Sequence, residues 1–315
     1  MIASFQNVVK RYGNVLALDN VDFPIYEGEV LGLLGPNGAG KTTAIRALAG
    51  LISIDGGEIT LFGERQDVNK LHLKQNLGLV TQEVTVFGEL TAAENLRFFG
   101  GLYGLRGRFL EERVAHALEF VGLTEHAEGY PRKFSGGMAR RLNIACALVH
   151  EPKFIIMDEP TVGTDPQSRK HILDSVKRLA EEGTTILYTS HYMEEVQAIA
   201  SRIVIMDQGH IIADGTLEDL VRRIHHEEIV RVTVHSPAPE LSAALRDVQG
   251  VKQVTNVGAE YTIVSQPQAN NLDRILALAQ QYGGVVAGSA EGTTLEDVFL
   301  TLTGKSLRDD EEGRS

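Results

Sequence analysis

The chain has 315 residues, of which 43% are hydrophobic and 23% charged, which excludes a disordered, collagen-like or disulfide-rich protein. Acidic residues outnumber basic ones by 42 to 30, and the net charge of −12 argues against broad electrostatic binding to nucleic acid or to an anionic membrane surface. The single cysteine, Cys146, fits a reducing compartment and a small buried core residue. We expect neither a signal peptide nor a membrane span, because no apolar run approaches the ~20 residues that cross a bilayer.

The first third of the chain predicts short strands and a helix. Residues 15–25 and 29–34 are strand-like runs bounded by Gly, Asn and Pro. The second run is nearly all apolar after its first residue, as in a strand that is buried on both faces of a sheet. Residues 41–49 then predict a helix directly after that strand.

A helical insert is predicted over about residues 84–134. Thr91 and Glu94 have the spacing of a capping box at a helix start. Farther along, residues 111–121 place four apolar side chains on one helical face, namely Val114, Ala117, Leu118 and Val121.

Strands and helices alternate again after the insert. Residues 154–157 and 185–189 predict strands, and Asp165 with Pro166 predicts the start of a helix that runs to about residue 182. Alternation of this kind indicates an α/β fold with a parallel sheet that is covered on both faces. We assign residues 1–225 to this first domain.

A smaller α+β domain is predicted over residues 226–315. Its pattern indicates strand, helix, strand, strand, helix and strand, as in a ferredoxin-like sandwich, at residues 229–235, 240–246, 252–257, 261–265, 270–281 and 285–289. A last helix over 294–302 precedes an acidic tail at 309–312, which we expect to be solvated. Residues 225–228 (His-His-Glu-Glu) predict a solvated linker rather than a metal site, because adjacent side chains point in different directions.

Residues 35–42 (GPNGAGKT) fit the phosphate-loop pattern G-x-x-x-x-G-K-[ST] between a buried strand and a helix. Glycines let the backbone wrap around phosphate oxygens, and the helix N-terminus supplies positive potential. Lys41 adds a charge for the β- and γ-phosphates, and the Thr42 hydroxyl suits Mg²⁺. The alternative is an ordinary glycine-rich turn before a helix. The candidate nucleotide ligands here are Gly35, Asn37, Gly38, Gly40, Lys41, Thr42 and Thr43.

Two adjacent carboxylates, Asp158 and Glu159, end the apolar strand over 154–157. Ligands bind at the carboxyl ends of strands in open α/β sheets. Asp158 is therefore the expected Mg²⁺ partner, and Glu159 is a candidate general base that orients and deprotonates the attacking water. The alternative for Glu159 is a cap of the following loop.

These motifs and their order resemble those of the ATP-binding cassette (ABC) ATPases over about residues 1–220. The resemblance implies a P-loop NTPase cassette with a helical subdomain at about 84–134. It also implies roles for residues whose function the local pattern leaves open. Tyr12 would stack on adenine, Gln82 would reach Mg²⁺ and water, and His191 would contact the γ-phosphate. Ser135, Gly136 and Gly137 match the signature motif, and Asp165 matches the loop after the catalytic glutamate.

The same resemblance implies a head-to-tail homodimer, in which the signature loop of one subunit closes on ATP held by the other. The segments after Glu159 and over 295–304 resemble those of drug and antibiotic exporters with a separate membrane permease. We therefore expect an ATP- and Mg²⁺-dependent subunit on the cytoplasmic face of the membrane, with residues 89–99 contacting the permease. Met138 and Thr164 depart from the usual family residues, glutamine and an aliphatic residue.

Two other functions stay open at this stage. A soluble ABC ATPase acting on ribosomes or DNA is the alternative, although one phosphate loop, a short insert and the acidic balance argue against it. A regulator-binding role of the C-terminal domain is the other.

Overall fold

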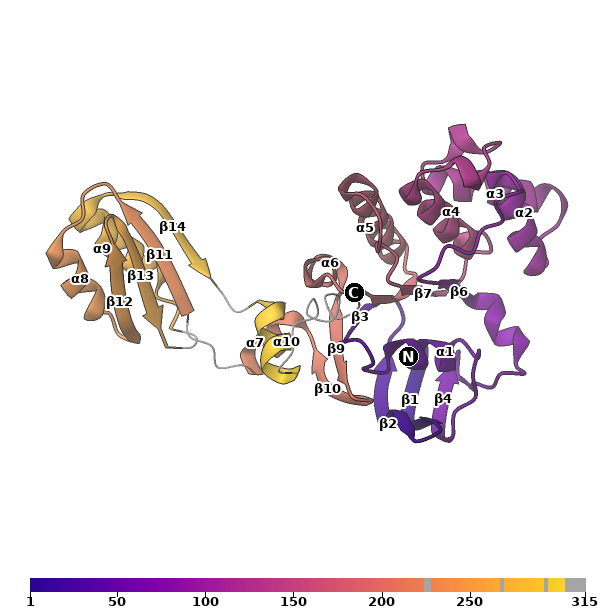
Figure 1. Ribbon diagram of the computed structural model, residues 1–315, viewed down its shortest axis with the longest axis horizontal. Helices are drawn as coiled ribbons and strands as arrows, with labels where there is room; N and C mark the ends of the chain where they lie inside the picture. Colours follow the sequence, from indigo (N-terminus) through magenta and orange to yellow (C-terminus); the bar gives the residue numbers. More distant parts are fainter. Residues whose placement is uncertain (224–227, 267–268, 292–293, 304–315) are drawn as a thin grey trace. The chain divides into compact units, whose positions relative to one another are not determined.

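The computed structural model describes residues 1–223, 228–266, 269–291 and 294–303 (Figure 1). It divides into two compact units: the first contains Met1–Leu217 and, among the described residues, Leu302 and Thr303, and the second contains Glu218–Thr301. The predicted boundary at residues 225/226 lies outside the described residues, and α7 (Leu217–Arg223) leads into the second unit.

An antiparallel sheet in the first unit has the strand order β2-β1-β4-β5. Its strands are β1 (Ala3–Tyr12), β2 (Val15–Ile25), β4 (Gly56–Leu61) and β5 (Glu64–Arg65). Phe5 pairs with Phe23 on one side and Ile59 on the other, and the two phenyl rings stack with centroids 4.4 Å apart. These side chains belong to the core that also receives α1 (Lys41–Leu48).

The second sheet has the order β10-β9-β3-β8-β7-β6 and is parallel except for the edge strand β10. The parallel strands are β3 (Val30–Leu34), β6 (Leu77–Val80), β7 (Phe154–Asp158), β8 (Thr185–Thr189) and β9 (Arg202–Asp207), and β10 spans His210–Gly215. Every residue of β3, β7 and β8 is buried, as their apolar sequences predict. The α/β prediction is confirmed. Because β3, β6, β7 and β8 run in the same direction, the residues that follow them meet at one edge of the sheet.

The predicted helical insert contains α2 (Ala92–Leu102) and α3 (Gly107–Phe120), and α4 (Gly136–Leu148) follows it (Figure 1). Short 3-10 turns lie at Leu71–Asn76, Thr124–His126 and Pro131–Lys133. The capping box is present, since the Glu94 amide donates to Thr91 Oγ1 (3.2 Å) and the Thr91 amide donates to Glu94 Oε2 (2.8 Å). The predicted apolar face of α3 is buried, from Val114 to Val121.

Helices α5 (Pro166–Glu181) and α6 (Met193–Ile199) complete the first unit. Asp165 caps α5 and Pro166 occupies its first turn, as predicted. Cys146 is buried in α4, and burial raises the pKa of its thiol, as expected for a core residue.

The second unit has its elements in the predicted order. They are β11 (Glu228–Val234), α8 (Pro239–Arg246), β12 (Val251–Val257), β13 (Glu260–Ser265), α9 (Leu272–Gly283) and β14 (Val285–Glu291). The sheet is antiparallel, with the order β12-β13-β11-β14, and this arrangement is that of a split βαβ unit. Helix α10 (Leu295–Thr303) follows. Two predicted segments lie outside the described residues, namely the acidic tail at 309–312 and residues 225–227 of the predicted linker.

Candidate functional site

The glycine-rich loop between β3 and α1 is tightly held by its surroundings. Gly38 and Gly40 have φ angles of +80° and +107°, which side chains rarely adopt. A Cβ atom at Gly40 would lie 2.5 Å from the Ala17 carbonyl oxygen, and one at Gly35 would lie 2.3 Å from the Met206 carbonyl oxygen. Glycine is therefore required in this loop both by the backbone conformation at Gly38 and Gly40 and by the close contacts at Gly35 and Gly40.

Two features at the end of this loop favour the binding of an anion. No side chain of the described residues makes a capping hydrogen bond at the N-terminus of α1, so the helix presents its first-turn amides there. Lys41 begins the helix, and its ammonium group donates to the carbonyl oxygens of Gly35 (2.6 Å) and Pro36 (3.1 Å). A buried cation held against its own loop can exchange carbonyl partners for phosphate oxygens.

A cleft of about 630 Å³ opens beside this loop. It brings together predicted site residues from four parts of the sequence, namely Asn37, Gly38, Gly40, Lys41, Thr42, Thr43, Gln82, Glu159 and His191. Val15, Leu16, Ala17 and Gln208 also line it, and sequence reasoning did not identify them. These four follow or belong to strands of both sheets, so only the packing of the sheets shows that they face the loop.

Asp158 is held at the carboxyl end of β7 by its neighbour in the sheet. The Thr189 hydroxyl donates to Asp158 Oδ1 at 2.8 Å, and it accepts from the Glu159 amide at 3.0 Å. Burial raises the pKa of Asp158 and the charge of Glu159 adds to that effect, while the hydrogen bond from Thr189 and, to a smaller extent, the charge of Lys41 oppose it. Sequence reasoning did not identify Thr189 as a site residue. A polar residue at the end of an apolar strand could have indicated it.

Buried Glu159 and half-buried His191 form a pair in the cleft. Glu159 Oε1 lies 2.6 Å from His191 Nε2, and Glu159 is only 6% exposed. Glu159 also has a φ angle of +50°, a costly conformation for a non-glycine residue. The remaining polar atoms, Glu159 Oε2 and His191 Nδ1, are buried without a hydrogen-bond partner among the described residues. A water or phosphate oxygen in the cleft would satisfy such atoms.

Gln82 and Tyr12 differ in how closely they approach this cleft. Gln82 follows β6 and lines the cleft, and its backbone carbonyl accepts from the Arg140 guanidinium. Tyr12 ends β1 and is 47% exposed, and it does not line the cleft, although it pairs with Val15, which does. The Lys10 ammonium lies 5.4 Å from the centre of the Tyr12 ring.

The signature residues lie together but do not line the cleft. Ser135 caps α4 by accepting from the Met138 amide (3.2 Å), so the Met138 departure keeps the cap. Asp165 caps α5 by accepting from the Ser168 amide (2.9 Å) and hydroxyl (2.6 Å), and these bonds lower the pKa of Asp165. A Cβ atom at Gly137 would lie 1.9 Å from Ser168 Oγ, so the two helix starts are in direct contact.

Thr164 is the second departure from the family pattern. Its hydroxyl donates to the Thr161 carbonyl at 2.7 Å. An aliphatic side chain lacks this bond, so the threonine gives the loop after Glu159 an additional local restraint.

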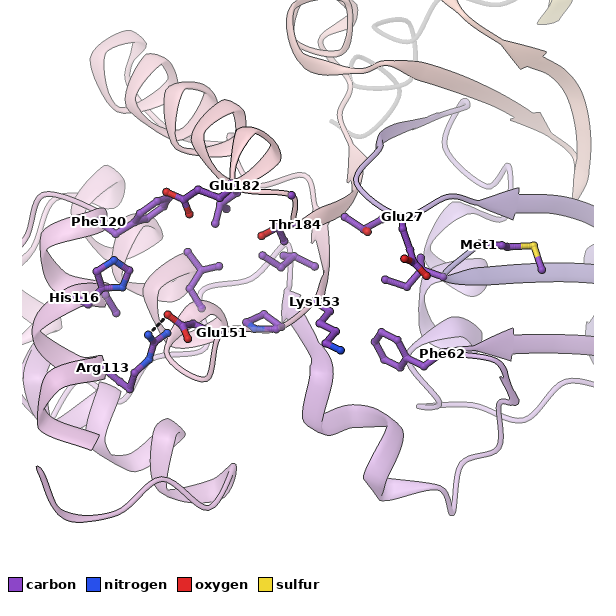
Figure 2. A pocket seen from close by; sticks show the side chains of 18 of the residues that line it. Met1, Glu27, Phe62, Arg113, His116, Phe120, Glu151, Lys153, Glu182 and Thr184 are labelled. Atoms are coloured by element: carbon purple, nitrogen blue, oxygen red, sulfur yellow. Dashed lines mark hydrogen bonds and ion pairs between the residues drawn. The ribbon is translucent and has the colours of Figure 1, made fainter. Parts of the chain in front are cut away.

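A second hollow, of about 740 Å³, lies at the opposite, amino-terminal ends of β7 and β8 (Figure 2). Figure 2 shows Arg113 and His116 of α3 on one side, and on the other Met1, which precedes β1, and Phe62, which follows β4; the Arg113 guanidinium is paired with the Glu151 carboxylate. Its lining includes neither the glycine loop nor the Asp158–Glu159 pair. Of the two hollows, only the cleft at the carboxyl ends is lined by the glycine loop, Glu159 and His191.

Metal-ligand clusters and membrane spans were also sought. Groups of three or more His, Cys, Asp or Glu side chains with metal-site geometry are absent from residues 1–223, 228–266, 269–291 and 294–303. Within the same described ranges, none of the helices combines the length and apolar character needed to traverse a bilayer.

Comparison with known proteins gives consistent matches. The family model described as "ABC transporter" matches residues 18–162. The chain is 43% identical to the linearmycin resistance ATP-binding protein LnrL of Bacillus subtilis, over 96% of this chain and 99% of that one. It is 39% identical to the daunorubicin resistance ATP-binding protein DrrA2 of Streptomyces coeruleorubidus, over 94% and 92% of the two chains. A solved dimeric ATP-binding cassette in a post-hydrolysis state, bound to ADP and Pi, matches with a TM-score of 0.63 and 27% identity, covering 69% of this chain and 99% of that one.

Proposed function

We propose that this chain, which belongs to the ABC transporter family as an ATP-binding subunit with ATPase activity, hydrolyses Mg²⁺-ATP to drive export through a separate membrane permease. The relatives that match nearly its whole length are named for drug resistance and for Nod factor export, which favours export over import. On this proposal the protein binds the permease at the cytoplasmic face of the membrane. The C-terminal α+β unit is an accessory part of the same subunit.

The cleft residues have distinct roles in this proposal. The glycine loop and Lys41 bind the phosphates, and the Thr42 hydroxyl and Asp158 hold Mg²⁺, with Gln82 reaching toward both the metal and the water. Bound Mg²⁺ would neutralise phosphate charge. Asp158 fits this use, because it is a buried carboxylate whose pKa is raised by burial and by Glu159, and a cation would relieve both effects.

The Glu159–His191 pair is the observation on which the catalytic proposal rests. Its partnerless Oε2 and Nδ1 atoms lie buried in the same cleft as the phosphate loop. Glu159 accepts a proton from the attacking water and orients it, while His191 contacts the γ-phosphate and holds the Glu159 carboxylate through the 2.6 Å contact.

A matched substitution tests this role. Glu159→Gln keeps the size of the side chain but removes the base, so ATP binding should persist while turnover falls by about 10²- to 10⁴-fold. The measurements are ATP affinity and the single-turnover hydrolysis rate of the full chain. The exposed Glu119→Gln on α3 is the control and should behave as wild type. Normal turnover in Glu159→Gln would reject Glu159 as the base.

An exposed aromatic cluster supports docking of the permease on the helical insert. Phe87 and Phe98 are each 44% exposed, and their rings contact each other edge to face with centroids 4.9 Å apart. Phe99 joins them, at 5.5 Å from Phe98. Exposed aromatic patches of this kind mark interaction sites, so we assign the cluster to an apolar cytoplasmic loop of the permease.

Replacing one ring of the cluster tests this contact. Phe98→Ser should reduce permease copurification in detergent by about tenfold while leaving ATP binding unchanged, because a central aromatic anchor contributes on the order of 1–2 kcal/mol or more to an interface. Phe109→Ser is the matched control, since Phe109 is 55% exposed on α3 outside the cluster. An equal loss of permease copurification in both variants, or no loss in either variant, would contradict the assignment.

A further inference from the structure

Glu195 is a buried carboxylate on α6 with an unusual set of partners. It is 3% exposed, and its Oε2 atom accepts from three hydroxyl groups, those of Thr161 (2.8 Å), Tyr188 (2.9 Å) and Ser190 (2.7 Å). Burying a carboxylate is costly, and three donors on one oxygen compensate for much of the lost hydration.

The three hydroxyl donors come from the segments that present the catalytic pair. Thr161 is two residues after Glu159, and Ser190 directly precedes His191. Tyr188 precedes Thr189, whose hydroxyl bonds both Asp158 Oδ1 and the Glu159 amide. One carboxylate oxygen therefore joins the loop after β7 to the end of β8.

The second carboxylate oxygen of Glu195 faces a cation. Oε1 lies 3.3 Å from Arg169 Nε on α5, and the Arg169 guanidinium lies over the Tyr192 ring at 4.1 Å. Arg169 is in the first turns of the helix that Asp165 caps. The carboxylate charge is thus matched by a guanidinium fixed on a third segment.

Building on the proposed function above, we propose that Glu195 is a positioning residue for ATP hydrolysis. It ties the loop of Glu159 to the loop of His191 through Thr161 and Ser190, and so maintains the 2.6 Å contact between Glu159 Oε1 and His191 Nε2. Its own side chain does not line the cleft, so its effect on the reaction passes through Glu159 and His191. Positional errors near 1 Å in such a site can cost about 10²-fold in rate.

Two near-isosteric variants probe this link. Glu195→Gln places an amide donor against either a hydroxyl donor or the Arg169 guanidinium, and Thr161→Val deletes one donor with little change of shape. We expect each to lower the single-turnover hydrolysis rate by about 10- to 100-fold and to change the ATP dissociation constant by less than about twofold. The exposed neighbour Glu194→Gln is the control on the same helix and should retain wild-type rates.

A double-mutant cycle separates positioning from general destabilisation. If Glu195 acts through Glu159, Glu195→Gln should have little further effect on the residual rate of Glu159→Gln. The idea is overturned if both Glu195→Gln and Thr161→Val hydrolyse at the wild-type rate, or if the Glu195 effect is undiminished in the Glu159→Gln background. If Glu195→Gln fails to fold by circular dichroism, Thr161→Val in the same cycle decides. Failure of the proposed function is recognised separately, as normal turnover in Glu159→Gln alone.

Discussion

Among single residues, the two carboxylates at the end of β7 show how the site costs stability. Asp158 and Glu159 are adjacent and buried, and Glu159 has a positive φ angle. Burial and like charge raise the pKa of Asp158, so its charged form is less favourable in the folded chain than in the unfolded one. Ionisation of Asp158 therefore lowers the free energy of unfolding. Glu159 lines the cleft, which fits a role of these carboxylates in binding and catalysis rather than in folding.

His150 allows a prediction of pH dependence at the same scale. Its ring stacks on Tyr103 with centroids 3.5 Å apart, and burial lowers its pKa to about 4. The unfolded chain binds this proton near pH 6.5, so stability is present above that pH and decreases as the pH falls toward 4. The loss is on the order of 3 kcal/mol. Urea unfolding at several pH values should show this loss relative to His150→Gln, while the exposed His116→Gln should follow wild type. If the free energy of unfolding changed equally with pH in the wild type and in His150→Gln, the assignment to His150 would be contradicted.

At the scale of elements, α2 combines a firm start with an exposed functional face. Its capping box satisfies two backbone amides, and Asn95, buried one turn later, bonds the backbone of Phe87 in both directions. These bonds fix the loop that presents Phe87 against Phe98. The geometry of the aromatic cluster therefore depends on how α2 begins.

Thr91→Ala tests the contribution of that helix start. Loss of the cap should lower the free energy of unfolding by about 1 kcal/mol, measured by urea denaturation, and should weaken permease copurification without changing ATP affinity. Thr124→Ala is the control, because Thr124 is exposed and begins a 3-10 turn without a side-chain cap. A loss no larger than that of Thr124→Ala would show that the cap is unimportant.

At the scale of the whole molecule, the first unit has two separate helix starts that suit anions. One is α1 in the cleft, and the other is α4, whose Gly137 lies against Asp165 and Ser168 at the start of α5, away from the cleft lining. Pairing of cassettes occurs in the solved relatives described as dimeric. Two-fold pairing would supply the second helix start to the cleft of a partner subunit.

Mixing two inactive variants tests such shared sites. Lys41→Ala and Ser135→Arg should each abolish most hydrolysis alone. In a random mixture, half of the dimers contain both variants and have one intact site, so roughly a quarter of the wild-type activity should return. If each subunit had a self-contained site, the mixture would show no recovery of ATPase activity. As a control for subunit exchange, each variant is mixed with the wild-type chain.

Local patterns in the sequence were enough to predict the phosphate loop, the buried strands β3, β7 and β8, and most helices of the helical insert, whereas strands such as β4, β9 and β10 were not predicted. Apolar runs define β3, β7 and β8, the Thr91–Glu94 spacing defines a helix start, and the glycine pattern of residues 35–42 defines the phosphate loop. Only the tertiary structure placed Glu159 against His191 and gathered three hydroxyl groups around Glu195. The Thr161–Glu195 contact joins residues 34 positions apart, and, like the Glu159–His191 contact, it depends on β7 and β8 lying parallel in register. Backbone hydrogen bonding between strands sets that register, and no local period of the sequence encodes it.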